Sequence, residues 1–359
     1  MLYKLIYLFH SDYSWLNVFR YITFRTILSA LFSLMVFFIF GSWAIDRLRA
    51  MQVGQYIRDD GPPNHKAKAG TPTMGGCLII PVVMLSTFLW ADPKNVHVWL
   101  VIFIALCFGI IGFVDDYLKI AHKNSRGLTI KAKFSFQLLA ALIVAIILLM
   151  HPGFDSHLNV PFFKTATPDL GLWYIPLAVF IIVGASNAVN LTDGLDGLAI
   201  GPIIVAFSSF LVFAYLSGHI KIASYLQIPY VSGSGDLSVL CGAVVGAGLG
   251  FLWYNSYPAE IFMGDVGSLP LGAVLGTVAV ITKQELILIL VGGIFVFEAL
   301  SVIFQVAYFK ITNGQRIFRM APIHHHFELK GWHESKVTIR FWIIAIILAL
   351  MSISTLKLR

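Results

Sequence analysis

Charged residues are scarce in this chain. Only 12% of its 359 residues are Asp, Glu, Lys or Arg, whereas a soluble domain carries about 25%. Hydrophobic residues make up 58%, and the mean hydropathy is +0.83. This composition excludes an ordinary soluble protein and indicates an integral membrane protein. The net charge of +7 requires no nucleic-acid partner, because basic loops follow from membrane orientation.

Cysteine is also scarce. Cys77, Cys107 and Cys241 lie in or at the edge of apolar runs, and their spacing matches neither a metal motif nor a disulfide framework. Residues 1–20 lack the charged start and the cleavage site of a signal peptide. The chain has no internal repeat and no low-complexity segment. These absences argue against a secreted disulfide-rich protein and against a repeat architecture.

Long apolar runs are abundant instead, and ten of them are candidates for membrane-spanning helices, which need about 20 residues each. The second and eighth are short and contain Pro81 and Pro270. The pattern predicts an all-α, polytopic integral membrane bundle that forms one transmembrane domain over residues 1–359. The predicted spans are Thr26–Ile45, Thr73–Trp90, Val96–Val114, Phe134–Met150, Leu172–Val189, Leu198–Leu216, Leu237–Tyr254, Val266–Ile281, Leu286–Tyr308 and Ile339–Leu356.

The orientation follows from the basic residues. The connections after the odd-numbered spans hold roughly twice as many Lys and Arg residues as the other side, and such an excess marks the cytoplasmic side. Both termini are therefore expected in the periplasm. The cytoplasmic connections lie near residues 46–75, 115–133, 187–198, 255–268 and 309–338.

The unusual polar clusters all fall on this cytoplasmic side. Polar groups at the mouth of a membrane bundle usually mark function, because they are costly to place there. Convergence of five connections on one face favours a reaction site at the membrane surface over a pore. The clusters are Lys68, Thr71 and Thr73; Asp115 and Asp116; Asp193 and Asp196; Asn255 and Asp265; and His324, His325 and His326.

The segment Asn187–Ala199 is the densest of these clusters. It places two amides and two carboxylates between two apolar runs, and its glycines permit a tight turn and close approach to a ligand. The alternative is a capped helix start, although one cap needs one such residue rather than four. The four polar residues are Asn187, Asn190, Asp193 and Asp196.

The remaining carboxylates suggest a metal. Asp115 and Asp116 end the third span, and Asp265 lies between glycines. Hard carboxylate oxygens with no thiolate nearby suit Mg²⁺ or Mn²⁺. Phosphoryl transfer depends on positioning and charge neutralisation, which acids, a metal and lysines supply. The alternatives are a solvated helix end paired with Lys119 and, for Asp265, a turn-forming aspartate.

The histidine triplet occurs within Arg319–Trp332. Consecutive imidazoles do not face one ion from a regular helix, which disfavours a structural zinc site. In a bent loop they could hold a pyrophosphate or a sugar, and a neutral surface cluster is the other alternative. Glu298 and Gln305 share a face of the ninth span and are expected to seal the bundle interior.

These motifs resemble those of the polyprenyl-phosphate N-acetylhexosamine-1-phosphate transferases over nearly the whole chain, from about Phe24 to Arg359. The triple-histidine motif is the sharpest signal, and it resembles the phospho-N-acetylmuramoyl-pentapeptide transferase family (translocase I) within that superfamily. The motifs that carry the resemblance are GTPTMGG at 70–76, GFVDDYLK at 112–119, NAVNLTDGLDG at 187–197, FMGDVGS at 262–268 and APIHHHFELKGW at 321–332.

The resemblance implies transfer of phospho-MurNAc-pentapeptide from its UDP nucleotide to undecaprenyl phosphate, with Mg²⁺, to give lipid I and UMP. It also implies a homodimer in the bacterial inner membrane with its site on the cytoplasmic face. Whether attack is direct or through a covalent intermediate stays open.

The resemblance also assigns roles to residues. It makes Asp265 the main metal ligand with Asp115 and Asp116 nearby, and Asp115 the base or, alternatively, the nucleophile. The implied uridine pocket is Gly194, Leu195, Asp196, Asn255 and Phe262. The implied sugar and diphosphate ligands are Lys68, Asn190, Asp193 and His324, with Thr73, His325 and His326 as further candidates and Lys133 for the lipid phosphate.

Two rival functions remain. A sister transferase acting on UDP-GlcNAc would share the aspartate motifs and is not expected to share the triple histidine. A transporter would place its binding residues near the membrane midplane, in broken helices of two related halves. The acids of this chain lie at one rim instead.

Overall fold

The structure is a computed structural model that describes residues 2–51, 70–122, 127–161, 163 and 166–357. Within these ranges the regular structure is helical, and an isolated antiparallel bridge joins His157 and Asp169. The helices are α1 (Leu2–Tyr7), α2 (Ile22–Ala50), α3 (Gly76–Trp90), α4 (Val96–Ala121), α5 (Ile130–Met150), α6 (Tyr174–Thr192), α7 (Ile200–Ser217), α8 (Ile220–Leu226), α9 (Leu237–Asn255), α10 (Asp265–Ile281), α11 (Ile287–Val291), α12 (Gly293–Ile311), α13 (Ile323–Glu328) and α14 (Glu334–Ser354).

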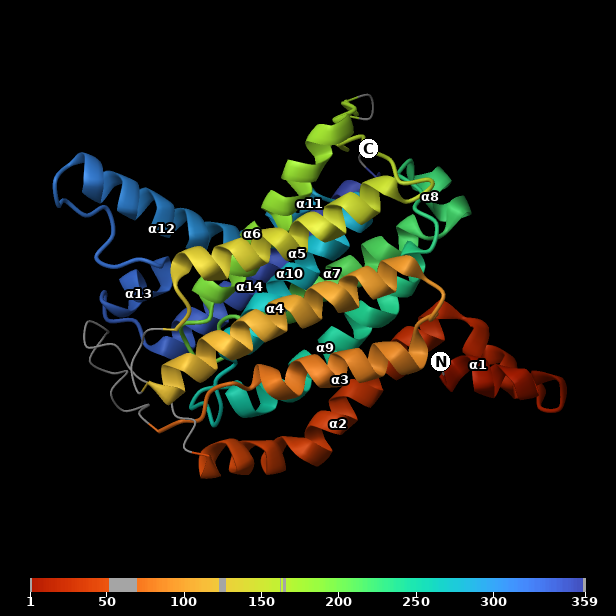
Figure 1. The fold of residues 1–359 in the computed structure, drawn as a ribbon, viewed down its shortest axis with the longest axis horizontal. Helices are drawn as coiled ribbons and strands as arrows, with labels where there is room; N and C mark the ends of the chain where they lie inside the picture. Colours follow the sequence, from red (N-terminus) through yellow and green to blue (C-terminus); the bar gives the residue numbers. More distant parts are fainter. Residues whose placement is uncertain (1, 52–69, 123–126, 162, 164–165, 358–359) are drawn as a thin grey trace.

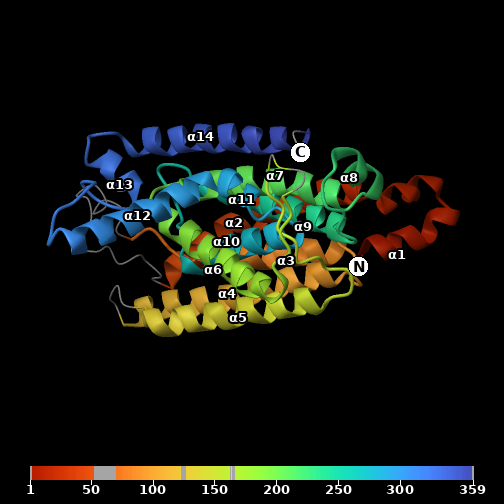
Figure 2. The same cartoon turned by 90° about the horizontal axis from the view of Figure 1, so that it is seen from above.

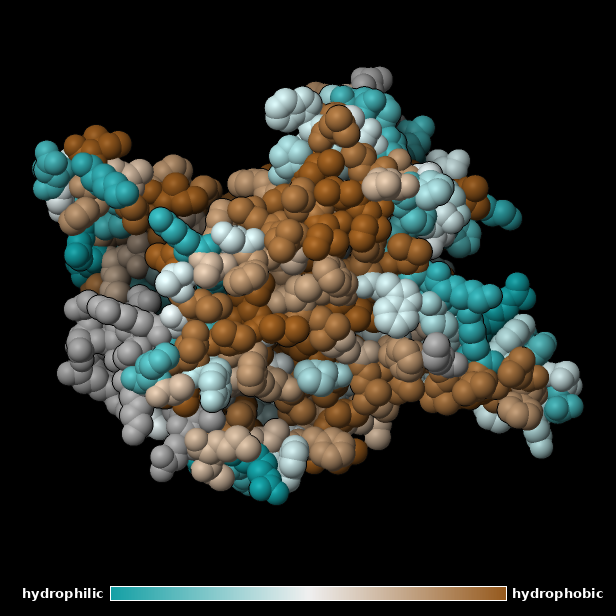
Figure 3. All heavy atoms as spheres, viewed as in Figure 1, coloured by the Kyte–Doolittle hydropathy of each residue, from teal (hydrophilic) through white to brown (hydrophobic). Residues whose placement is uncertain are grey.

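The predicted membrane bundle is confirmed. Eight helical segments of the described chain are long and apolar enough to cross a membrane, and α3 and α10 are shorter apolar helices. These two are the spans that contain Pro81 and Pro270. Figure 3 shows apolar side chains across the middle of one face and hydrophilic side chains toward its two ends. Figure 2 shows α14 along one flank, α5 along the other and α10 between them.

The ninth predicted span is not one helix. It divides at Gly292 into α11 and α12. Two consecutive glycines, Gly292 and Gly293, occupy the break, and glycine pairs are a common cause of sharp helix bends. Figure 1 shows the far end of α12 running away from the bundle, beside α13.

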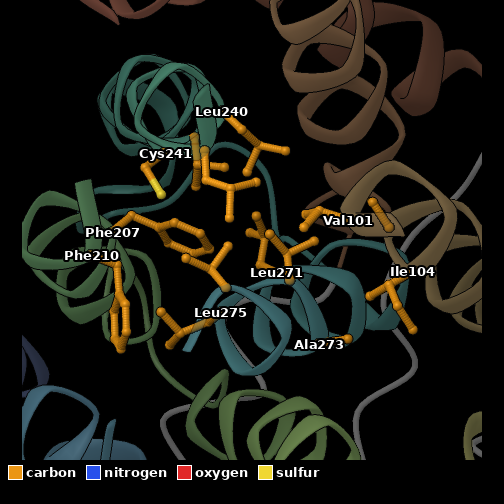
Figure 4. Close-up of a cluster of buried hydrophobic side chains, with 14 of the residues drawn as sticks. Val101, Ile104, Phe207, Phe210, Leu240, Cys241, Leu271, Ala273 and Leu275 are labelled. Atoms are coloured by element: carbon orange, nitrogen blue, oxygen red, sulfur yellow. The ribbon is translucent and has the colours of Figure 1, made fainter. Parts of the chain in front are cut away.

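Helix α10 forms the centre of the bundle and packs against α3, α4 and α6. All its residues from Val266 to Ile281 are buried, and Leu271, Ala273 and Leu275 join a cluster with side chains of α4, α7 and α9 (Figure 4). Glycines make this packing close. A Cβ atom at Gly112 of α4 would lie 2.2 Å from the carbonyl oxygen of Asp265.

The elements that carry the predicted site residues meet at one end of the bundle. The C-terminal ends of α4, α6 and α9 meet the N-terminal end of α10 there, close to α13 (Figures 1 and 2). Both termini lie toward the opposite end (Figure 1). The described parts of the five connections that the sequence places on one side lie at this end (Figure 1), and the membrane side of that end stays a prediction.

Candidate active site

Three carboxylates form the centre of the site. Asp115, Asp116 and Asp265 each offer an oxygen, and these oxygens lie within 4.8 Å of one another. In the described ranges, no other group of three or more acidic, His or Cys side chains is as close. Asp115 and Asp116 are buried. The alternative of a solvated helix end is therefore wrong, because α4 continues beyond these residues to Ala121.

Two lysines hold the three carboxylates together. The Lys119 ammonium lies 2.6 Å from Asp115, 3.3 Å from Asp116 and 3.1 Å from Asp265. Lys133 of α5 lies 2.5 Å from Asp265 and 3.7 Å from Asp115. The pairing of Lys119 with Asp115 and Asp116, which the sequence suggested only as part of the solvated-helix-end alternative, is present, although both carboxylates are buried. The contact of Lys119 with Asp265 was not predicted, because that contact joins two helices.

Backbone groups place each carboxylate. Asp265 is the first residue of α10, where negative charge is favourable, so the alternative of a turn-forming aspartate is wrong. The preceding Gly264 has a φ of +73°, a conformation that favours glycine. Asp116 accepts a 3.1 Å hydrogen bond from the N–H of Val266, and Asp115 accepts a 2.8 Å bond from the N–H of Leu128.

The C-terminal end of α6 contributes amides and a further acid. The Asn190 side-chain amide donates to Asp265 at 2.7 Å and to Ser268 at 2.9 Å, which fixes the Asp265 carboxylate from the other side. Asn187 instead bonds Gln137 of α5 and lies away from this cluster.

Asp193 follows directly after α6 and is partly buried. Burial, together with the charges of Asp265 and Asp116, raises the pKa of Asp193 to about 8. A carboxyl group that is largely protonated at neutral pH can donate a hydrogen bond to a phosphate or sugar oxygen.

The loop between α6 and α7 holds three predicted uridine ligands. Gly194 contacts His324 so closely that a Cβ atom there would lie 2.3 Å from the Nε2 atom. The Leu195 side chain packs in an apolar cluster with α14. Asp196 is buried and accepts a 3.0 Å bond from the N–H of Ala259. None of the polar residues of this segment caps α7, so the alternative of a capped helix start is wrong.

The other predicted uridine ligands join two connections. Asn255 accepts a bond from the N–H of Gly197 and donates to the carbonyl of Ile261. The N–H of Phe262 donates to the carbonyl of Pro72, and the carbonyl of Phe262 accepts from the N–H of Gly75. Thr73, between these two residues, is buried. Lys68 lies outside the described residues. The roles of these residues in substrate binding stay predictions.

The three histidines have different surroundings. His324 is buried beside Glu298, with Nδ1 3.1 Å from Oε1. His325 lies 2.7 Å from Glu328. His326 accepts a 3.0 Å bond from the N–H of Arg319, and burial lowers its pKa, as do the nearby Lys330 and Arg319 charges. The triplet lies within α13, and His324 is the member whose Nε2 atom lies against Gly194.

The donor set fits a small divalent cation. Three carboxylates of hard oxygen lie around one point with an amide beside them, and Mg²⁺ and Mn²⁺ prefer oxygen ligands of this kind. Lys119 and Lys133 balance the negative charge of the same group.

The fold and this cluster define a polytopic membrane protein that holds carboxylates, lysines and a buried histidine at one end of its helical bundle. The model of glycosyl transferase family 4 matches residues 98–283, and a phospho-N-acetylmuramoyl-pentapeptide-transferase signature matches residues 68–80. Proteins with that transferase name from Syntrophus aciditrophicus, Citrifermentans bemidjiense and Desulforapulum autotrophicum are 61%, 59% and 57% identical over 359 residues, with 100% of both chains covered. The chain therefore belongs to the phospho-N-acetylmuramoyl-pentapeptide-transferase family, within glycosyl transferase family 4.

Proposed function

We propose that this protein transfers phospho-MurNAc-pentapeptide from UDP-MurNAc-pentapeptide to undecaprenyl phosphate at the cytoplasmic face of the inner membrane, which yields lipid I and UMP. Transfer of phospho-MurNAc-pentapeptide to a lipid carrier, in peptidoglycan synthesis, follows from membership of the family. The particular donor and acceptor, the membrane side and the metal belong to the proposal.

The single observation that carries the proposal is the convergence of Asp115, Asp116 and Asp265 with two lysines at one end of a membrane bundle. One substrate is a water-soluble nucleotide, and the other is a lipid whose phosphate lies at the interface. A site at the rim is accessible to both. A transporter would instead place its polar residues near the midplane.

The three aspartates would hold Mg²⁺ or Mn²⁺, which neutralises phosphate charge when bound. Lys119 and Lys133 bind phosphate oxygens and reduce the repulsion between the two anionic substrates. Asp115 is the base for the lipid phosphate. Its buried carboxylate lies 3.7 Å from Lys133, the residue expected to bind that phosphate.

Donor binding is assigned to the surrounding connections. The uridine would occupy the space bounded by the loop that contains Gly194 and Asp196 and by Asn255 and Phe262. The sugar and diphosphate would contact Asn190, Asp193 and His324, together with Lys68, Thr73, His325 and His326. Because one pyrophosphate is exchanged for another, the task of these residues is alignment of the attacking oxygen with the β-phosphorus.

The test is UMP release by the purified protein. Release is expected from UDP-MurNAc-pentapeptide and not from UDP-GlcNAc, and it should stop when EDTA removes the metal and return with Mg²⁺. Release from UDP-GlcNAc alone would instead identify the sister transferase. Light scattering of the purified protein would test the homodimer that the family resemblance implies.

Asp265→Asn is expected to lower UMP release by at least about 100-fold, because it removes the charge at the centre of the site. Asp155→Asn is the matched control, since Asp155 is exposed in the connection after α5, away from the site. Release by the Asp265→Asn protein at the parent rate would contradict the assigned role.

A further inference from the structure

Glu298 and His324 form a buried pair inside the membrane bundle. Glu298, on α12, is 0% exposed and His324, on α13, is 1% exposed, with Nδ1 3.1 Å from Oε1. Apart from this contact, the second carboxylate oxygen and Nε2 have no hydrogen-bond partner among the described residues. An unsatisfied buried polar group costs about 1–3 kcal/mol, and more if it is charged, so these two buried atoms indicate a ligand that the protein itself does not supply.

The two ring nitrogens of His324 face different surroundings. Nδ1 is the atom near the Glu298 carboxylate. Nε2 is the atom that lies against Gly194, where a Cβ atom would come within 2.3 Å. The Gly194 loop follows Asp193 and lies between α6 and α7. Glu298 therefore faces one nitrogen of the imidazole, and the Gly194 loop faces the other.

A carboxylate behind a histidine has a known physical effect. It accepts the proton of the nearer nitrogen, fixes the tautomer and the orientation of the ring, and stabilises the imidazolium form. A carboxylate within a membrane helix is also costly unless it has such a partner. Nothing in the sequence of α12 connects Glu298 to this task, since it precedes the histidine motif and lies on another helix.

We propose that Glu298 is a positioning residue that orients His324, so that Nε2 donates a hydrogen bond to an anionic oxygen of the donor substrate beside Gly194. Glu298 acts through His324 and does not touch the substrate. This inference rests on the proposed function, because it concerns binding of the sugar-nucleotide diphosphate at the same site.

A double-mutant cycle tests the proposal with Glu298→Gln, His324→Gln and the double variant. Glu298→Gln keeps the shape of the side chain and removes its charge. We expect it to lower kcat/KM for UDP-MurNAc-pentapeptide by about 10- to 100-fold, with KM for undecaprenyl phosphate unchanged. In the His324→Gln background the same change should have almost no further effect, because the residue through which Glu298 acts has already been removed.

Ser301→Ala is the matched control. Ser301 is buried on α12 near Glu298, and within the described part of the chain its hydroxyl donates to the Glu298 carbonyl of its own helix, at 2.7 Å. It should retain the parent kcat/KM. Unfolding temperatures of all variants, followed by tryptophan fluorescence, separate lost function from lost folding, and Glu298→Asp should restore part of the activity that Glu298→Gln loses.

The outcomes separate the two proposals. If the parent protein releases no UMP from UDP-MurNAc-pentapeptide, the proposed function fails. If the parent is active and the losses from Glu298→Gln and His324→Gln multiply in the double variant, Glu298 does not act through His324 and this inference is overturned. An equal rise in KM for both substrates would overturn it as well.

Discussion

At the scale of single residues, the site depends on carboxylates and lysines that balance one another's charge. Asp115, Asp116 and Asp265 would repel one another if Lys119 and Lys133 did not lie among them. The same crowding reaches Asp193, whose pKa is about 8 because of burial and the neighbouring carboxylates. This coupling makes the stability of the metal-free protein depend on pH.

The sign of that dependence follows from linkage. The pKa of Asp193 rises from 3.8 to about 8 on folding, so between these values the folded state binds more protons than the unfolded state. Stability from this group is complete below about pH 4 and is lost as the pH rises toward 8.

Asp193→Asn should remove this part of the pH dependence. In EDTA, the unfolding temperature of the parent should fall relative to that of the variant as the pH increases from 5 to 9. Most of this fall should occur below about pH 8, the pKa of Asp193 in the folded protein. Asp12→Asn, at an exposed position in the N-terminal segment, is the control. A constant difference between parent and Asp193→Asn across this range would show that Asp193 is not titrating there.

At the scale of helices, the site is held by the close contact of α4 and α10. The Asp115–Asp116 pair lies one turn after Gly112, and Asp265 begins α10 where Gly112 touches its carbonyl. Any side chain at Gly112 would separate the two helices that carry the carboxylates.

Gly112→Ala should therefore destabilise the protein by about 1–3 kcal/mol, the usual range for an overpacked core, and lower UMP release. Gly109→Ala is the matched control on the same helix, because the nearest atom to a Cβ atom there is 4.0 Å away. It should be neutral or slightly stabilising. Thermal unfolding of the two variants, together with UMP release, provides the comparison, and equal stability for both would contradict the packing argument.

At the scale of the whole molecule, the candidate site and the chain termini lie toward opposite ends of the bundle. The aspartates, lysines and histidines lie at one end of the bundle, and both termini lie toward the other (Figure 1). The excess of basic residues predicts that the site end is cytoplasmic.

Reporter fusions test this orientation. Alkaline phosphatase fused after Lys357 should be active and green fluorescent protein there should be dark, because the C-terminal end is expected in the periplasm. The same reporters fused after Gly314, in the connection between α12 and α13, should give the opposite result. Fluorescence at both positions would show that the two ends of the bundle are not on opposite sides.

The sequence by itself determined the membrane class and the all-helical bundle, because hydropathy is a local property. The sequence predicted ten apolar spans, of which eight form helices long enough to cross a membrane and two, α3 and α10, form shorter ones. It also indicated the three aspartates as metal ligands, and the structure brings these together. The break at Gly292 was missed, since an apolar run does not reveal where packing bends it.

Only the tertiary structure decided which side chains meet. The contact of Lys119 with Asp265 and the apposition of Glu298 to His324 join residues on different helices. Residues on different helices meet according to the rotation and spacing of those helices, which glycine contacts and core packing set for the bundle as a whole.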